Sequence, residues 1–139
     1  MSVPVGKRSK NKLEVWMKAV DLAKYTMQIT ANTRNFPGRY RTMIMRINDA
    51  AINCAANLWK ANKIYIGKGC DLRAKQDRAY LQNKAIGELD ELLFLLDLAE
   101  SVMAKPNGDT PINMFYWAEK AVSVKQLAQA WRDSDKSRG

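Results

Sequence analysis

The sequence contains no histidine. Histidine is the commonest general base and the commonest metal ligand in proteins. Its absence excludes Ser-His-Asp and Cys-His catalytic sites, zinc sites with histidine ligands, and the Glu-x-x-His motif of di-metal helical bundles. Carboxylate-only or lysine-based chemistry stays open in principle, but Glu88, Asp90 and Glu91 are typical of a solvated helix face. We therefore expect a protein that is not an enzyme and has no metal site and no cofactor.

Cysteine is scarce as well. The two cysteines, Cys54 and Cys70, lie too far apart in sequence to form a metal-binding or redox motif. Cys54 falls in an apolar helical stretch and is expected to be a buried thiol. Cys70 follows Gly67-Lys68-Gly69 and is expected to be an incidental exposed thiol in a loop. That loop lacks the rest of the phosphate-binding pattern and no strand precedes it, so we interpret it as a connection between helices.

Long apolar runs are also absent. The richest run, residues 92–96, is closed by Glu91 and Asp97 and is far shorter than the roughly 20 residues that a membrane span needs. The basic N-terminal residues are followed by no apolar segment of the kind found in secretory signals. These features predict a cytoplasmic protein without a membrane span.

Basic residues are abundant. The chain has 23 lysines and arginines against 14 acidic residues, a net charge of +9. The excess is concentrated in residues 1–12 and 36–78, whereas acidic residues outnumber basic ones in residues 79–105. Such asymmetry is typical of a surface that binds a polyanion such as nucleic acid. The alternative, that helices simply need charged outer faces, stays open.

Apolar residues recur at three- and four-residue spacings through most of the chain, which predicts helices and no strands. Prolines and glycines mark the breaks between them. The predicted helices cover about residues 12–35, 39–63, 71–104, and from Thr110-Pro111 through Trp131. Asp71 and Thr110 are the expected N-caps of the last two. Four long helices with short turns predict an antiparallel up-down bundle over residues 12–135, after a flexible basic arm (1–11) and before a polar tail (136–139).

A second apolar stripe on each of the first two helices widens the predicted buried surface. On the second helix it comprises Met45, Ile52, Ala56 and Trp59. Such stripes indicate burial on two sides, within the chain and at a subunit interface. In the third helix, Gly87 predicts a close helix crossing.

The four tryptophans fall at core spacing and are expected to be buried: Trp16, Trp59, Trp117 and Trp131. Tyr65 and Tyr80 flank the basic middle segment instead. They are therefore the better candidates for stacking on bases.

Several segments together resemble a family of bacterial four-helix-bundle proteins. This family includes the 23S rRNA intervening-sequence proteins and the accessory variability determinants of diversity-generating retroelements. The matching segments are residues 13–19, 22–23, 36–37, 40–52, 61–65, 73–78, 89–98 and 130–136. The closing Trp-Arg-x-Ser-Asp-Lys pattern and the Asn-Lys-Ile-Tyr at residues 62–65 look most like the accessory-determinant branch. Residues 52–58 lack the proline and the Glu-Gly that the intervening-sequence branch shows at this place.

The resemblance implies a basic, ring-like homopentamer that binds a reverse transcriptase and its template RNA to support mutagenic cDNA synthesis, with DNA as a further candidate ligand. Carried over, Arg41, Arg46, Arg73 and Arg78 would bind the partner, with Arg132 and Lys136 as secondary candidates. The basic middle segment adds four more candidates: Arg39, Lys60, Lys63 and Lys68. The alternative is a structural interaction module of the intervening-sequence type, with a basic surface for an acidic protein or a ribosomal partner.

Overall fold

The structure is a computed structural model. It describes the backbone of residues 5–104 and 112–137 and, within these, the side chains from residue 14 onward. Four long helices and one short 3-10 helix make up this part of the chain, which contains no strand. Their bounds are α1 (Val5–Thr30), η1 (Gly38–Tyr40), α2 (Arg41–Lys63), α3 (Leu72–Met103) and α4 (Met114–Ser137). The predicted all-helical fold is confirmed, and the four helices form a bundle.

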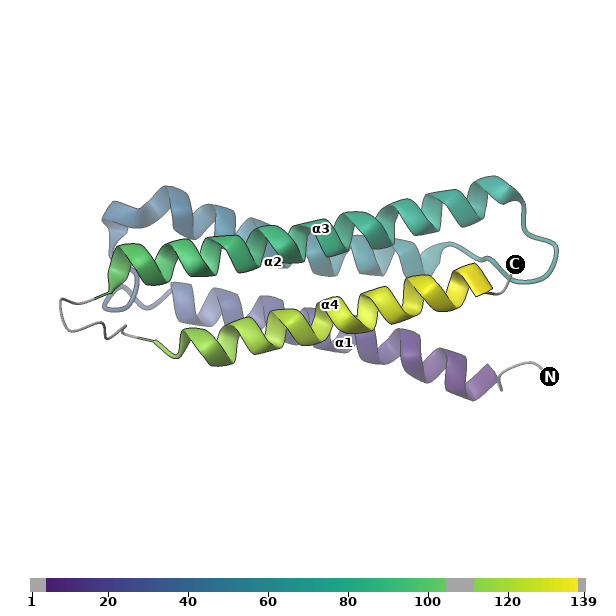
Figure 1. The fold of residues 1–139 in the computed structure, drawn as a ribbon, viewed down its shortest axis with the longest axis horizontal. Helices are drawn as coiled ribbons and strands as arrows, with labels where there is room; N and C mark the ends of the chain where they lie inside the picture. The colour runs from purple at the N-terminus through teal and green to yellow at the C-terminus, as the bar shows by residue number, and fades with distance from the viewer. Residues whose placement is uncertain (1–4, 105–111, 138–139) are drawn as a thin grey trace.

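Each long helix packs against two others. α1 and α3 each contact both α2 and α4, and the α2–α3 interface is the most extensive. Figure 1 shows that the first turns of α1, the last turns of α4 and the α2–α3 connection lie at one end of the long axis. The α1–α2 connection lies at the other end. We refer to these as the α2–α3 end and the α1–α2 end.

The core runs along the centre of the bundle, where the predicted apolar faces meet. Alanines with no exposed surface on all four helices bring the backbones close together. The large side chains fill the space between them. The fully buried large apolar residues are Val15, Leu22, Phe36, Ile47, Leu58, Leu89, Leu92, Leu95, Trp117 and Val124.

Trp117 connects α4 to α1. Its indole Nε1 donates a hydrogen bond to Thr26 Oγ1 at 3.0 Å, and Thr26 Oγ1 donates to the Leu22 carbonyl at 2.7 Å. Phe36 and Tyr25 contact the indole edge to face, with ring centroids 5.9 and 6.2 Å away. The only polar atom of this large side chain is therefore satisfied inside the core, as burial of a tryptophan requires.

α1 differs from its prediction at both ends. It begins at Val5, so residues 5–11 of the predicted arm are helical. No proline or glycine interrupts the chain between Lys7 and Asn35, and nothing in the sequence stops the helix from starting early. It ends at Thr30 because Asn32 forms a turn: its side chain accepts from the Arg34 amide and its carbonyl accepts from the Phe36 amide. This turn places Phe36 in the core.

The two predicted N-caps have different outcomes. Asp71 caps α3, since its carboxylate accepts a hydrogen bond from the Ala74 amide at 2.8 Å. Thr110 lies outside the described residues. α4 begins at Met114, where Asn113 Oδ1 accepts from the Tyr116 amide at 2.9 Å.

One packing prediction was wrong. Gly87 is exposed, and a side chain at this position would meet nothing within 4 Å, so the glycine serves no close crossing. In the second stripe of α2, Ala56 is half-buried, whereas Met45, Ile52 and Trp59 are 58%, 41% and 48% exposed. Burial of this stripe at a subunit interface stays a prediction. α2 already packs against α1 and α3, and no further helix of the described chain covers its outer edge.

Within the described residues, no helix has both the length and the apolar character to cross a membrane.

Glu88 provides a pH-dependent test of the packing. Burial raises the pKa of its carboxyl, and the neighbouring Glu91 carboxylate raises it further. Because the pKa is higher in the folded state, this group's favourable contribution is complete at low pH and is lost as the pH rises through the folded-state pKa.

We expect Glu88→Gln to increase the free energy of unfolding at neutral pH, by about 0.5 kcal/mol or less. The gain should vanish below about pH 4, where wild-type Glu88 is protonated in both states. Urea denaturation at the two pH values measures this difference. Glu100→Gln, on the exposed side of the same helix, controls for the loss of one charge. A gain that persists at low pH would contradict the explanation.

Candidate nucleic-acid interface

The predicted contact residues do not form one continuous surface. Arg39 and Arg41 lie at the α1–α2 end, at the start of α2. Five further candidates lie at the α2–α3 end: Lys60, Lys63, Lys68, Arg73 and Lys136. Because α2 has 23 residues, the two groups are separated by about 35 Å. A single ligand would therefore have to extend along the length of the bundle to contact both groups, or contact only the group at one end.

Three predicted residues already pair with acidic residues of the chain. Arg46 donates to Glu91 on α3, and Arg132 donates to Asp133 at 3.2 Å. Arg132 also donates to Asn83 Oδ1 at 2.9 Å. The third is Arg78. Among the described residues the remaining predicted residues form no ion pair: Arg39, Arg41, Lys60, Lys63, Lys68, Arg73 and Lys136. All of these are exposed.

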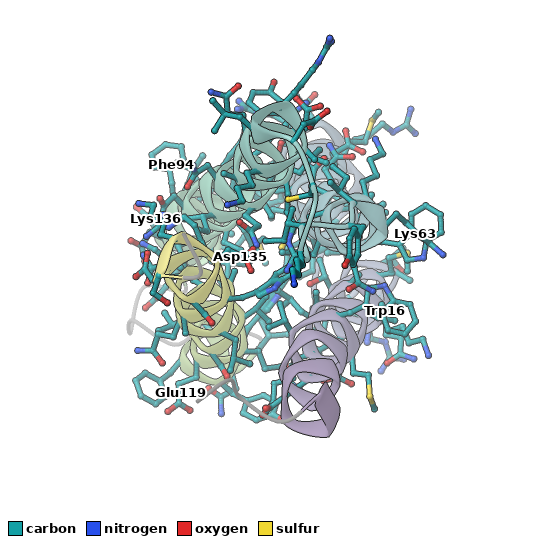
Figure 2. The ribbon with its side chains drawn as sticks, turned by 90° about the vertical axis from the view of Figure 1, so that its right-hand side faces the viewer. Trp16, Lys63, Phe94, Glu119, Asp135 and Lys136 are labelled. Atoms are coloured by element: carbon teal, nitrogen blue, oxygen red, sulfur yellow. The ribbon has the colours of Figure 1, made fainter. Side chains whose placement is uncertain are left out.

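Arg78 is an interior residue, only 1% exposed. Its Nε and Nη2 donate to the two carboxylate oxygens of Asp135 at 2.8 and 3.0 Å, and its Nη1 donates to the Ile64 carbonyl at 3.1 Å. Gln82 donates to the same carboxylate at 2.7 Å, and the guanidinium lies 4.7 Å from the Trp131 ring centroid. Figure 2 shows Asp135 pointing into the middle of the α2–α3 end. Arg78 therefore stabilises the fold. Its buried guanidinium is not part of the exposed surface that a nucleic acid could contact.

The sequence held a signal for this cluster. Arg78 and Gln82 continue the buried positions Ala85 and Leu89 toward the start of α3 at spacings of four, three and four residues. Asp135 likewise follows the buried Ala128 at heptad spacing on α4. A basic and an acidic residue that both fall on core faces would have indicated an internal ion pair.

The burial of the tryptophans differs in part from the prediction. Trp117 and Trp131 are buried as expected. Trp16 is half-buried, and Trp59 is 48% exposed, so the core prediction was wrong for Trp59. Lys63 Nζ lies 4.8 Å from the Trp59 ring centroid. Figure 2 shows Trp16 and Lys63 on the same side of the bundle and Lys136 on the other side.

The two predicted stacking tyrosines are exposed. Tyr65, just beyond the end of α2, is 70% exposed, and Tyr80 on α3 is 64% exposed. Exposed rings close to exposed lysines are a combination that single-stranded nucleic acids bind. Of the two, only Tyr65 lies in a segment without acidic residues, because no aspartate or glutamate occurs between Asp49 and Asp71.

The described part of the chain contains no cluster of three acidic or cysteine side chains that would suit a metal ion. Cys54 is buried as expected, and its burial raises the pKa of the thiol to about 12, with a further contribution from the Glu88 carboxylate. Cys70, expected to be exposed, is half-buried.

Comparisons with protein-family models, curated proteins and solved structures find no match for this chain. A functional conclusion for this chain therefore rests on its fold and on the residues at its surface.

The cysteines give a direct test of the packing. A thiol-specific reagent such as 5,5′-dithiobis(2-nitrobenzoate) should modify Cys70 first in the native protein, because Cys54 is buried and protonated. Cys54 should react only after denaturation. Cys70→Ser should remove nearly all native reactivity, and rapid reaction of that variant would show that the α2 core is open.

The Arg78–Asp135 pair predicts a large stability difference between two neighbouring aspartates. Asp135→Ala leaves a buried guanidinium without its carboxylate and should lower the free energy of unfolding by about 3–5 kcal/mol. Asp133→Ala removes an exposed pair and should change it by about 0.5 kcal/mol or less. Urea denaturation measures both. Equal effects would contradict the structural role of the buried pair.

Proposed function

We propose that the protein is a non-catalytic accessory subunit that binds nucleic acid and a nucleic-acid enzyme. More specifically, it binds the reverse transcriptase and template RNA of a diversity-generating retroelement in the cytoplasm. In this proposal the chain is an antiparallel up-down four-helix bundle that assembles into a ring-like homopentamer. The observation that carries the nucleic-acid part is the group of exposed cations at the α2–α3 end that form no ion pair with the described residues, in a segment where aromatic rings are also exposed.

The charge supports this binding physically. Each lysine that contacts a phosphate releases condensed counterions from the nucleic acid, so affinity falls as salt rises. Lysines that already pair with acidic side chains contribute less, because their charge is partly compensated. An assembly of several copies would multiply the net charge of +9 per chain. A long polyanion would then contact several subunits at once.

A second candidate function has one observation in its favour. The exposed stripe Met45, Ile52 and Trp59 is the kind of apolar surface that protein partners cover. It favours a structural interaction module of the intervening-sequence type, whose basic surface meets an acidic protein or a ribosomal partner. In that case the exposed lysines would contact carboxylates instead of phosphates.

We expect replacement of Lys60, Lys63 and Lys68 by glutamine to weaken RNA binding strongly. The slope of log affinity against log salt concentration should fall by about three, roughly one for each phosphate contact that is lost. Filter binding or fluorescence anisotropy across a salt series measures both quantities.

A matched control removes the same three charges elsewhere. Arg46, Lys120 and Lys125 are each ion-paired with a carboxylate on a neighbouring helix, so their replacement by glutamine should change the slope much less. Equal loss in both variants would show only a net-charge effect. RNA binding that is absent at low salt, or independent of salt, would contradict the proposed function. Co-purification with a reverse transcriptase tests the second partner.

A further inference from the structure

The last two turns of α2 carry an indole ring with much of its surface exposed. Trp59 is 48% exposed, although tryptophan contributes a large apolar area when it is buried. Lys63, one turn further on, places its ammonium 4.8 Å from the ring centroid. A cation in this position is attracted to the ring face. The indole thus lies at the surface beside a positive charge.

A second aromatic ring, that of Tyr65, is exposed just beyond the end of α2. Tyr65 is 70% exposed, and its phenol ring lies over the backbone of Gly67. A Cβ atom at residue 67 would come within 2.1 Å of the Tyr65 hydroxyl oxygen and 2.3 Å of Cζ. The ring therefore occupies the space that any larger side chain at residue 67 would need. Its position depends on glycine there.

The charged residues between Trp59 and Gly69 are all lysines. Lys60, Lys63 and Lys68 are exposed and form no ion pair with the described residues. The nearest acidic residue along the chain, Asp71, uses one carboxylate oxygen to accept the Ala74 amide as the cap of α3. From helical rise and extended-chain geometry, the Cα atoms of Trp59 and Tyr65 lie within about 13 Å of each other. Residues 59–68 thus combine two open rings with three uncompensated ammonium groups, and we name this segment the aromatic-lysine segment.

We propose that the aromatic-lysine segment binds unpaired nucleotides, with bases stacked on Trp59 and Tyr65 and phosphates at Lys60, Lys63 and Lys68. This inference rests on the nucleic-acid part of the proposed function and specifies its ligand as single-stranded. In a duplex the flat faces of the bases are covered by neighbouring bases, so a surface ring can stack only on an unpaired base. The lysines alone would bind either form through the phosphates.

Charge also favours a nucleic acid over a protein at this segment. Three exposed ammonium groups that form no ion pair with the described residues favour a partner with several negative charges close together. A phosphate backbone has one on every nucleotide. Each base that stacks on a ring also brings its own phosphate toward these flexible side chains.

The test compares two RNA probes on the full chain. One is a short oligoadenylate single strand, and the other is an RNA duplex of the same length. Fluorescence anisotropy at fixed salt gives the affinity for each. Trp59→Leu keeps an apolar side chain but removes the ring, and it should weaken single-strand binding about tenfold while duplex binding stays unchanged. Trp59→Phe keeps a ring and should restore most of the single-strand affinity.

Gly67→Ala tests the second ring without changing charge. The added methyl group must displace the Tyr65 ring, so single-strand affinity should fall toward that of Tyr65→Leu. Gly38→Ala is the matched control, because a side chain at Gly38 would meet nothing within 4 Å. Circular dichroism melting of each variant verifies that the fold is intact.

The outcomes separate this inference from the proposed function. Wild-type protein that binds neither probe would overturn both. Binding to both probes that Trp59→Leu leaves intact, or weakens equally, would overturn the stacking inference and leave general nucleic-acid binding standing. A Trp59→Leu variant with a changed native mass and equal losses for both probes would place Trp59 in a protein interface, which also overturns it. Selective loss of single-strand binding with unchanged native mass is the supporting result.

Discussion

The buried ion pair between Arg78 and Asp135 determines how one end of this bundle is built. A charge removed from water is costly unless its hydrogen bonds are satisfied. Arg78 meets that requirement with the Asp135 carboxylate on α4 and the Ile64 carbonyl after α2, and its guanidinium also lies over the Trp131 ring of α4. The last turns of α4 and the end of α2 are thereby held against α3. The α2–α3 connection, which carries Lys68 and Tyr65, begins at this anchored point.

The basic residues of the chain therefore have distinct physical roles. Arg78 stabilises the interior, and surface cations such as Lys120 and Lys125 pair with carboxylates across helices. A third group is exposed and forms no ion pair with the described residues, and it includes Lys60, Lys63, Lys68 and Arg73 at the α2–α3 end. Net charge alone treats the three groups alike. The ion-pair geometry separates them. What distinguishes the α2–α3 end is the lack of acidic residues between Asp49 and Asp71 together with the exposed rings of Trp59 and Tyr65.

The exposed outer stripe of α2 has a similar division. Met45 and Ile52 lie on the first half of the helix, and Trp59 lies in its final turns beside Lys63. A neighbouring subunit that covered the first half would leave the aromatic-lysine segment open. The two proposed properties of this chain, self-association and nucleic-acid binding, thus need not compete for the same surface.

The sequence by itself determined the helical fold, the approximate helix bounds, most of the core and the Asp71 cap, because these follow from local spacing and from the residues that start or stop helices. It also indicated the basic middle segment and the exposure of Tyr65. Only the tertiary structure decided that Arg78 is internal and that Trp59 is open. The helical spacing of Arg78 held a signal for an internal position, but it does not identify the partners, which come from α4 and from the residue after α2. The exposure of Trp59 depends on which helices lie beside its face. A side chain beside the core-facing side of a helix is buried only where another helix packs over it. None of the described helices packs over Trp59.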